Sequence, residues 1–333
     1  MKNTITGLTI IALTLLAGCA APDDKLLLTV DFQQNQTLRY KFVSSRDIEV
    51  DWAPGPEQNQ DKKKQTKKKV DKTTESFEMV VAYTPLNVDP YGLTTIKATC
   101  ESVKTKRKIP TGRQGSTAAD ATQHLKGKSF TFTVAPNGKI EDYSQLDELI
   151  KQIGQKAFRT KTDQGRIKEP DMIGDFISTQ WFLWDAVSAI QHPAKGLDVG
   201  QSWTSKLSVP TPMVMRQARD VQYTLDEIRE TEKGRLAVIK SSYSISDSTP
   251  KTWPIPYTGR FQMSGRFGFL RGYKVLELQG NGEELFNIDT GTTQQYKQNY
   301  KMTLTAGLPM PIEVNPKMTI DQKLTMTLLE NHK

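Results

Sequence analysis

Cysteine and histidine are scarce in this chain, which has two cysteines and three histidines among 333 residues. The histidines, His124, His192 and His332, lie far apart and lack the spacing of metal ligands, so we expect no metal site. No apolar run reaches the roughly twenty residues that a bilayer-spanning helix needs. We therefore expect a water-soluble body without a metal-based or histidine-based catalytic centre.

The shortage of cysteine also limits disulfide chemistry. If Cys19 carries lipid, as the motif described next indicates, Cys100 has no partner within the chain. Cys100 alternates in phase with Ile96 and Ala98, which is the pattern of a strand with one buried face. We expect Cys100 to be a small apolar core residue, with a reactive thiol as the alternative.

The N-terminus has the layout of a bacterial secretion signal. Lys2 precedes an apolar run that ends in Leu16-Ala17-Gly18-Cys19. A small-residue pair before a cysteine at this depth is typical of the lipobox of an exported lipoprotein, cleaved between Gly18 and Cys19. A transmembrane anchor and an ordinary signal peptide are the alternatives. The lipobox predicts a signal peptide over residues 1–18 and membrane attachment through lipid on Cys19.

The residues after the lipobox indicate the membrane to which the protein is delivered. A linker over 19–24 precedes the first strand-like segment, and Ala20, rather than Asp, follows the lipidated cysteine. In a bacterium with two membranes, this predicts release to the periplasmic face of the outer membrane.

The net charge of +8 is concentrated in one segment. Residues 61–72 hold seven lysines and two aspartates, which is a net charge of +5, so the rest of the chain is close to neutral. A charge this local indicates one basic surface rather than a nucleic-acid-binding fold, and export also argues against nucleic acid as a partner. We expect a polar loop over 53–73, either merely solvated or used for binding.

Alternation of period two dominates the chain and predicts half-buried antiparallel strands. From Leu38 to Trp52 the even positions are mostly apolar and the odd positions polar, with Ser44 and Arg46 as the main exceptions. Turn sequences such as Asp289-Thr290-Gly291 separate the alternating segments. The apolar positions of the other segments are Phe77, Met79, Val81 and Tyr83; Phe130, Phe132 and Val134; Val221, Tyr223 and Leu225; Tyr296, Tyr300, Met302 and Leu304; and Met318, Ile320, Leu324, Met326 and Leu328.

Only the middle of the chain, residues 144–192, has a helical pattern. Ser144 begins a capping-box spacing before the first helical segment. A second helix is predicted from Pro170 to the end of the segment. Trp181 and Trp184 lie on its apolar face, where we expect them in the core; lining a ligand cavity is the alternative.

In two segments of the chain, four residues recur with the same spacing between them. Both place a turn glycine between strand-like stretches, which predicts two similar β units, 25–143 and 193–333, joined by the helical middle. The first set is Leu125, Gly127, Gly138 and Tyr143, and the second set, 153 residues later, is Leu278, Gly280, Gly291 and Tyr296.

Three short motifs occur together with the lipobox. They are Leu38-Arg39-Tyr40-Lys41-Phe42, Phe132-Thr133-Val134-Ala135-Pro136-Asn137-Gly138 and Val199-Gly200-Gln201-Ser202-Trp203. In these motifs the chain resembles an uncharacterised family of exported, β-rich bacterial lipoproteins, and the likeness spans most of the mature chain. The family carries no known activity, so the resemblance implies fold and address alone. The lysine-rich segment is not part of the family pattern.

One segment has the form of a catalytic motif. Residues 286–292 read Phe-Asn-Ile-Asp-Thr-Gly-Thr, which fits the apolar-Asp-Thr-Gly-Thr signature of aspartic proteases. That chemistry needs a second aspartate sharing a proton with the first. The repeat places Pro136-Asn137-Gly138 opposite the motif, without a carboxylate, and Asp-Thr-Gly is also an ordinary hairpin turn. A hydrolase built on Asp289 is therefore a minor alternative.

The order of the first strands predicts a basic rim. A meander of strands at 38–52, 74–84 and 93–104 would bring two basic segments to one end of the sheet, and a strand over 26–32 paired with 38–50 would bring Cys19 there too. We expect this rim to face the anchoring membrane or an anionic envelope polymer. Its residues would be Lys62, Lys63, Lys64, Lys67, Lys68, Lys69, Lys104, Lys106, Arg107 and Lys108.

These patterns predict an α+β fold, with a mostly antiparallel, curved or half-barrel sheet of two similar β units and two central helices packed on it. The expected function is that of a non-enzymatic, membrane-anchored envelope lipoprotein without a cofactor. It would bind an apolar ligand such as an acyl chain, or an anionic envelope component at the basic rim. A sheet wrapped around helices resembles lipoprotein carriers in architecture alone. A structural or assembly role in the envelope is the alternative.

Overall fold

The computed structural model describes residues 25–52, 70–108, 120–158, 166–168, 172–209, 217–248, 262–264, 271–307 and 315–330. The strands are β1 (Leu38–Asp51), β2 (Val70–Val88), β3 (Thr94–Lys108), β4 (Ser129–Val134), β5 (Ile140–Asp142), β6 (Arg166–Lys168), β7 (Ser202–Ser208), β8 (Ala218–Thr231), β9 (Gly234–Ile245), β10 (Gln262–Ser264), β11 (Arg271–Asn287), β12 (Thr292–Gly307) and β13 (Lys317–Leu329). The α-helices are α1 (Ser144–Phe158), α2 (Ile173–Phe182) and α3 (Asp185–Ser188), and the 3₁₀ helices are η1 (Ala121–Leu125) and η2 (Pro193–Lys195).

Eleven of these strands form one antiparallel sheet in the order β5-β4-β3-β2-β1-β13-β12-β11-β9-β8-β7. The first long strand pairs with the last one, from Arg39 opposite Leu329 to Asp51 opposite Lys317. The N-terminal and C-terminal strands of the described residues therefore belong to one continuous sheet. The short strands β6 and β10 form a separate parallel pair.

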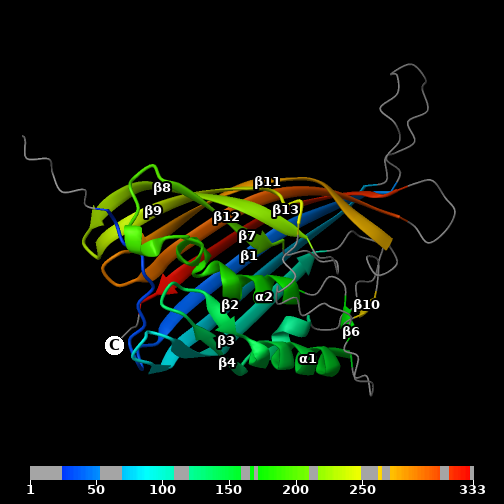
Figure 1. Cartoon of the computed structure of the whole chain (residues 1–333). Coiled ribbons are helices and arrows are strands. Elements are labelled where there is room, and N and C mark those ends of the chain that lie inside the picture. Colours follow the sequence, from blue (N-terminus) through cyan, green and yellow to red (C-terminus); the bar gives the residue numbers. More distant parts are fainter. Residues whose placement is uncertain are drawn as a thin grey trace, which may run out of the picture.

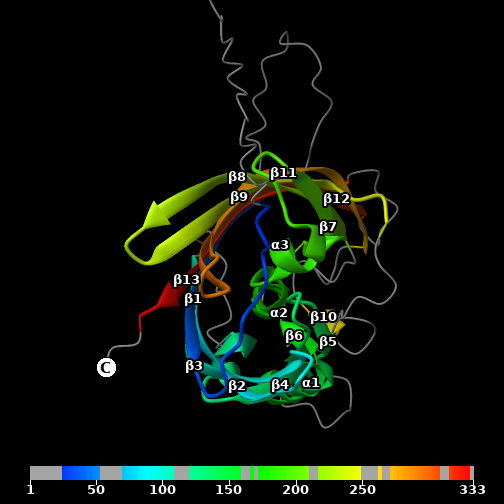
Figure 2. The same ribbon diagram turned by 60° about the vertical axis from the view of Figure 1, so that its left-hand side comes forward.

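The sheet is strongly curved, and its concave face encloses α2 and α3. Figure 1 shows the long strands crossing the molecule obliquely, and Figure 2 shows the sheet bending around the two short helices. Helix α1 lies beside β4 at one margin of the sheet rather than at its centre. The concave face and the helices inside it form the core of the molecule.

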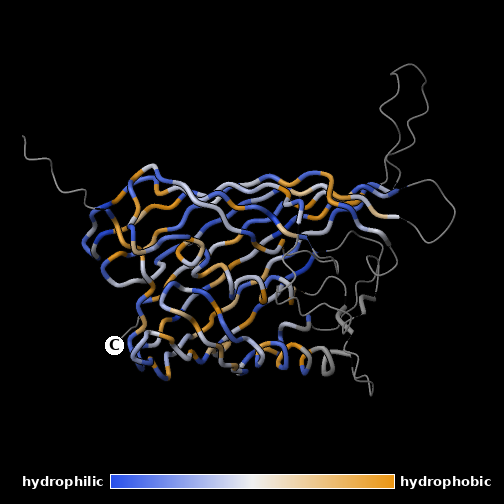
Figure 3. The backbone as a smooth tube through the Cα atoms, viewed as in Figure 1, coloured by the Kyte–Doolittle hydropathy of each residue, from blue (hydrophilic) through white to orange (hydrophobic). Residues whose placement is uncertain are grey.

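Alternating burial along the strands follows the alternating sequence. On β1, the inward side chains of Tyr40, Phe42, Ile48 and Val50 are at most 1% exposed. Figure 3 shows hydrophobic and hydrophilic positions alternating along the long strands. The prediction that Cys100 is a buried core residue is confirmed, because its thiol is free and only 2% of the residue is exposed.

The predicted α+β class with two central helices is wrong. The fold is mostly antiparallel β-sheet, and the described helical segments are few and short. The second predicted helix divides into α2, of 10 residues, and α3, of 4 residues. It breaks because Thr293 Oγ1 donates a hydrogen bond to the Leu183 carbonyl at 2.9 Å and Trp184 turns into the core. Within the described residues, no helix is both long and apolar enough to cross a membrane.

The two segments of the proposed repeat agree only around their turns. Gly138 and Gly291 both have positive φ, 85° and 61°, and both join antiparallel strands. Leu125, however, lies in η1, whereas Leu278 lies in the long strand β11. The backbone paths therefore differ at the start of the two segments.

Residues 25–36 cross one end of the curved sheet, and we call this segment the N-terminal strap (Figure 2). The amide of Leu26 donates to the Leu197 carbonyl at 2.9 Å, and the amide of Asn35 donates to the Pro85 carbonyl at 2.9 Å. The strap thus links the segment that precedes β7, at one margin of the sheet, to β2 in the other half of the sheet. Leu28 is a buried residue of this crossing, 2% exposed.

The strap corrects the predicted position of the N-terminus. Residues 26–32 do not pair with 38–50, because β1 has β2 and β13 as its neighbours. Lys25 therefore lies at the end of the sheet where β1 begins. The basic end of β3, at Lys108, is at the opposite end, because it pairs with Thr74 near the start of β2.

Candidate functional site

A network of buried charges crosses the concave face and reaches the helix inside it. Arg46 on β1, with a side chain 1% exposed, donates from Nε to Glu75 Oε2 on β2 at 2.6 Å. Its Nη1 donates to Asp175 Oδ2 on α2 at 2.8 Å. One arginine thus binds two carboxylates from different elements. The network attaches α2 to the floor of the sheet.

The network extends to β3 and η1. Glu75 Oε1 accepts a hydrogen bond from Arg107 Nε at 2.9 Å, and Arg107 Nη2 donates to Asp120 Oδ2 at 3.0 Å. Asp120 also accepts from the backbone amide of Thr122 at 3.0 Å, which caps η1. Positive and negative groups alternate along this row. We call Arg46, Glu75, Asp175, Arg107 and Asp120 the Arg46 network.

On its other side the Arg46 network meets polar groups of β13 and β12. Gln322 donates from Nε2 to Ser44 Oγ at 2.9 Å and also to Asp175 Oδ1. The hydroxyl of Tyr300 donates to Gln322 Oε1. Ser44 donates in turn to Asp175 Oδ1 at 3.0 Å. These side chains occupy core positions and carry the polar row toward the next strands.

A second arginine, Arg219 near the start of β8, lies in an aromatic box. Its guanidinium carbon is 4.3 Å from the ring centre of Tyr243, 5.0 Å from that of Phe182 and 5.6 Å from that of Tyr300. Its Nη2 donates to Gln298 Oε1 at 2.7 Å. We call these five residues the Arg219 box. Arg219 itself is 0% exposed.

The Arg219 box leaves hydrogen-bonding capacity unused. Arg219 Nε and Nη1 have no hydrogen-bond partner within the described part of the chain, and neither has Gln298 Nε2. Rings stabilise a cation, by about 2 kcal/mol for a well-placed desolvated ring, but they do not replace these bonds. Each unmade buried hydrogen bond costs about 1–3 kcal/mol. The box therefore retains a deficit of hydrogen-bond acceptors around a buried positive charge.

Glycines on β11 make room for the box. Gly282 lies opposite Gln298, and a Cβ added to it would come within 2.3 Å of the Tyr243 hydroxyl. A Cβ at Gly280 would lie 2.6 Å from Cβ of Tyr300. The absence of both side chains lets the aromatic groups of the box approach this strand.

Two further carboxyl groups in the interior have raised pKa values. Burial raises the pKa of Glu284 to about 8, partly offset by its hydrogen bond with the Thr293 hydroxyl, which lies 2.6 Å from Glu284 Oε1. Burial raises the pKa of Asp185 to about 6, against hydrogen bonds from Tyr223 and Ser205 that lower it. Glu284 is therefore mostly uncharged at neutral pH and adds no counter-ion to the interior.

The helices inside the sheet are held by several polar contacts. Tyr83 donates to Gln180 Oε1 at 2.8 Å, and Tyr223 donates to Asp185 Oδ2 at 2.7 Å. Trp203 Nε1 donates to the Ala186 carbonyl at 2.7 Å. With the Asp175 contacts, these bonds attach α2 and α3 to the sheet at separate points. These polar contacts add to the apolar packing of α2, whose Phe176 and Phe182 contact the rings of Phe130 and Tyr296.

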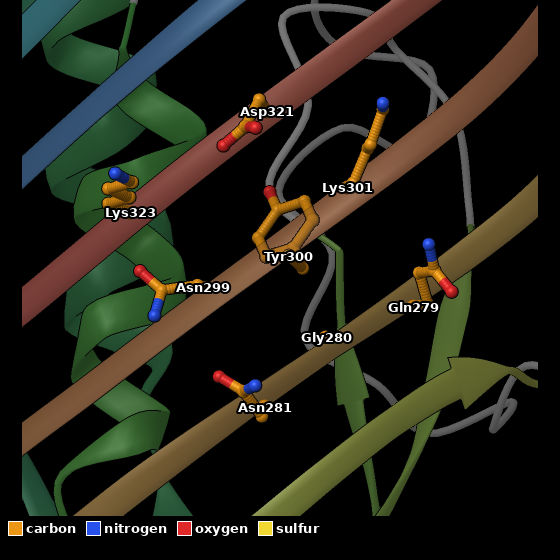
Figure 4. Close-up of a pocket in the computed structure, with 8 residues that line it drawn as sticks. All are labelled: Gln279, Gly280, Asn281, Asn299, Tyr300, Lys301, Asp321 and Lys323. Atoms are coloured by element: carbon orange, nitrogen blue, oxygen red, sulfur yellow. The ribbon is translucent and has the colours of Figure 1, made fainter.

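A groove on the outer face is less suited to a specific ligand. It has a volume of about 470 Å³ and lies over Gly280 on the convex side of β11–β13 (Figure 4). Figure 4 shows Lys301, Lys323 and Asp321 pointing away from the sheet, so its walls carry exposed charges of both signs. The buried groups with unmade hydrogen bonds lie instead on the concave side.

The predicted cavity residues occupy different positions. Trp184 is 2% exposed and contacts Phe32, Tyr83 and Phe132 edge-on or tilted, at the inner side of the strap. Trp181 is partly buried and packs against Tyr143 at 5.6 Å between ring centres. Trp184 thus belongs to the core beneath the strap, as expected, and its role in lining a ligand cavity stays a prediction.

The predicted basic rim is divided by the structure. Lys104, Lys106 and Lys108 are exposed on the outer face of β3, whereas Arg107 points inward to the Arg46 network. The residues Gly18, Cys19, Lys62, Lys63, Lys64, Lys67, Lys68 and Lys69 lie outside the described part of the chain.

Asp289, the candidate protease residue, caps a turn. Its carboxylate accepts from the Arg235 backbone amide at 2.8 Å and from Arg235 Nε at 3.0 Å. These bonds lower the pKa of Asp289. Arg235, rather than a second aspartate, is therefore the group that its carboxylate binds. Among the described residues, no group of three histidine, cysteine or carboxylate side chains has a metal-binding arrangement.

The model of a family of unknown function, DUF6263, matches residues 74–294, from β2 to the beginning of β12. The chain belongs to this family. The match confirms the expected relation to a family without a known activity, whereas export and lipidation stay predictions. No curated protein matches the chain.

Two solved structures show distant likeness to this DUF6263 protein. One is lipovitellin, from a study of lipid–protein interactions, with 10% identity and a TM-score of 0.45; the match covers 90% of this chain and 26% of that one. The other is an outer-membrane channel from Pseudomonas putida F1, with 8% identity and a TM-score of 0.19, covering 92% and 99% of the two chains. The DUF6263 chain thus spans about a quarter of lipovitellin. Neither likeness is close enough to assign a fold or a function.

Proposed function

We propose that this DUF6263 protein is a non-enzymatic binding protein of the cell envelope, tethered through lipid on Cys19, that holds an acyl chain against the concave face of its sheet. The observation that carries the proposal is the apolar concave face with only short helices in it. Met302 and Leu304 on β12 and Ile320 on β13 are each 0% exposed and belong to the core cluster on that face. A curved sheet of this kind offers a long apolar surface to a flexible ligand.

The way in which the helices are attached supports binding between helix and sheet. Helices α2 and α3, of 10 and 4 residues, are held at separate polar points such as Asp175–Arg46 and Asp185–Tyr223. Short helices depend on tertiary contacts for stability, because isolated helices of this length are marginal in water. An acyl chain entering beside them replaces apolar contacts with apolar contacts, so little burial energy is lost.

The strap gives the concave face one closed end. Its buried residues Leu28, Val30 and Phe32 cover the end of the sheet where β1 begins. The opposite end, where β12 finishes near Ala306, is the side from which a ligand enters in this proposal. Ala306 is 1% exposed and faces inward, whereas its neighbour Thr305 is less buried.

The test is native mass spectrometry of the full chain purified from its own envelope. We expect a bound molecule with an acyl chain. Ala306→Phe, which fills the inward face at the open end, lowers its occupancy at least fivefold, whereas Thr305→Phe on the other face leaves it unchanged. Absence of any acyl molecule, or equal occupancy in both variants, contradicts the proposal.

A second candidate function is to bridge the anchoring membrane and an anionic envelope polymer. Lys25 lies six residues after Cys19, which spans at most about 21 Å. The sheet along β1 is 14 residues long, or roughly 46 Å. Lys25 and the basic end marked by Lys108 lie at opposite ends of the sheet, which supports the proposal that the anchor is far from the rim. The basic rim therefore points away from the anchoring membrane in this proposal.

Salt-dependent co-sedimentation of the full chain with phosphatidylglycerol vesicles or anionic polymer tests the bridging role. The double variant Lys104→Glu/Lys106→Glu weakens binding at least tenfold at low salt. The same change at Lys301 and Lys323, in the middle of the outer face, has little effect. Binding that does not depend on salt, or that both double variants weaken equally, contradicts specific binding at the basic rim.

A further inference from the structure

The Arg219 box has the composition of a binding site for an anion. Its guanidinium keeps its positive charge at every physiological pH. No acidic side chain is paired with Arg219 among the described ion pairs. Asp185 is engaged with Tyr223 and Ser205, and Asp175 is engaged with Arg46. The charge of Arg219 lowers the pKa of Asp185, but among the described residues no acidic side chain forms an ion pair with the guanidinium.

The orientation of Gln298 is fixed, and it points a donor away from Arg219. Gln298 Oε1 accepts from Arg219 Nη2 at 2.7 Å and from the Tyr296 hydroxyl at 3.1 Å. Because both of these groups donate, the oxygen must face them, and Nε2 is left without an acceptor. Reversing the amide would place Nε2 against the guanidinium, which also donates. The unused donor therefore belongs to the native arrangement.

Unmade donors outnumber unmade acceptors in this part of the interior. Among the described residues, the buried atoms without a hydrogen-bond partner are the donors Arg46 Nη2, Arg219 Nε, Arg219 Nη1 and Gln298 Nε2, and the carboxyl oxygen Glu284 Oε2. Thr293 gives its single hydroxyl proton to the Leu183 carbonyl, so a protonated Glu284 donates to Thr293 through Oε1, and Oε2 is the one unmade acceptor. A carboxylate or phosphate contains only acceptors and carries the compensating charge.

We infer that Arg219 and Gln298 bind the anionic head of the acyl ligand, with the rings of Phe182, Tyr243 and Tyr300 around the first part of its chain. The inference rests on the proposed function and narrows its ligand to a single-chain or multi-chain amphiphile with a carboxylate or phosphate head. Phe182 is the last residue of α2, so the head lies between that helix end and the strands β8 and β12.

A single substitution next to Arg219 would supply the missing anion as a side chain of the protein itself. Gln298→Glu keeps the oxygen that contacts Arg219 and replaces the unpaired amide nitrogen with a second oxygen. We expect this variant to fold, to unfold at a higher temperature than the wild type, and to lose selectivity for anionic ligands. Asn299→Asp is the matched control, because it adds the same charge at the next residue of β12, on the outer face.

The experiment compares three amphiphiles of one chain length: palmitate, hexadecyl phosphate and 1-hexadecanol. Each displaces the neutral dye N-phenyl-1-naphthylamine from the full chain held in phosphatidylcholine nanodiscs. In the wild type and in Asn299→Asp, at least one anionic amphiphile binds tenfold or more tightly than hexadecanol. In Gln298→Glu this ratio falls to about one. The stronger of the two anions shows whether the head is a carboxylate or a phosphate.

Results that contradict the inference differ from results that contradict the proposed function. If all three amphiphiles bind the wild type equally, or if Gln298→Glu keeps the preference for anions, the inference is wrong while acyl binding stands. If none of the three displaces the dye from the wild type, both the acyl-binding function and the inference are wrong. Arg219→Lys is a second test, because it keeps the charge but removes the planar set of donors; we expect at least a fivefold loss of the anion preference.

Discussion

Arg46 on β1 and Asp175 on α2 form a buried ion pair, with Nη1 2.8 Å from Oδ2. Both side chains are at most 3% exposed. A strand of the sheet and the helix inside it are therefore joined by charges that water does not screen. Removing one member leaves the other charge without this partner in the core, and such a loss is costly.

Asp175→Asn should destabilise the protein by about 3–5 kcal/mol, because Arg46 then keeps only Glu75 as a counter-ion. Urea unfolding followed by tryptophan fluorescence measures the change. Asp321→Asn is the matched control, because Asp321 is exposed on the outer face; it should change stability by no more than about 0.5 kcal/mol. Equal effects at the two positions would show that the pair does not anchor α2.

The strap should loosen when Gly291 gains a side chain. Gly291 has a φ of +61°, and a Cβ on it would lie 2.4 Å from the backbone nitrogen of Asp31. Gly200 has a φ of +90° with open space around it, so Gly200→Ala carries the backbone strain without the collision. Gly291→Ala should therefore be less stable than Gly200→Ala by about 1 kcal/mol or more. It should also speed hydrogen exchange at Asp31 and trypsin cleavage after Lys25, and matching behaviour of the two variants would refute a packed strap.

Stability should fall as the pH rises from about 5 to 8.5. The folded-state pKa of Glu284, about 8, lies above its ordinary value of 4.5, so protonation favours the folded state. This stabilisation is complete below the ordinary value and is lost as the pH passes through about 8. Asp185, with a pKa of about 6, acts in the same direction at lower pH.

Glu284→Gln should remove most of that pH dependence. At pH 8.5 the variant should be more stable than the wild type by roughly 3–5 kcal/mol, because a neutral amide replaces a buried carboxylate. Glu283→Gln, on the opposite face of β11, controls for the change in net charge. Thermal unfolding at several pH values gives the result; a wild-type profile in Glu284→Gln would mean that Glu284 is not the responsible group.

Cys100 should resist modification in the folded protein. Burial raises the pKa of its thiol to about 12, so little thiolate forms at pH 8. Iodoacetamide should label it only after unfolding. A cysteine introduced at Lys97, exposed on the same strand, should react at least a hundredfold faster. Rapid labelling of Cys100 in the folded protein would show that its thiol is reactive.

Alternation in the sequence predicts most strands and their inward faces, because burial on a half-buried sheet repeats every two residues. The buried polar groups leave the same kind of signal. Arg219 is in phase with Val221 and Tyr223, and Gln298 lies in phase between Tyr296 and Tyr300. Ser44 and Arg46 on β1 show the same pattern of polar residues in phase with an apolar face. The alternation therefore identifies Arg219 and Gln298 as buried polar residues, but it does not show that they meet.

The partners of those groups cannot be read from local pattern. Arg46 meets Asp175 across 129 residues of sequence, and Arg219 meets Gln298 across 79. The break between α2 and α3 has the same cause, because the hydroxyl that binds the Leu183 carbonyl comes from Thr293 on a distant strand. Helical periodicity continues through that point, and tertiary contacts override it.

The most direct test of acyl binding at the concave face is photo-crosslinking in growing cells with a diazirine-bearing palmitate. Peptide mass spectrometry of the purified full chain then locates the labelled residues. The account predicts labels on inward residues of α2, β12 and β13, such as Phe182, Met302 and Ile320, and their loss when unlabelled palmitate is in excess. Labels confined to the outer face or to the segment before Lys25, or no label at all, would contradict acyl binding at the concave face.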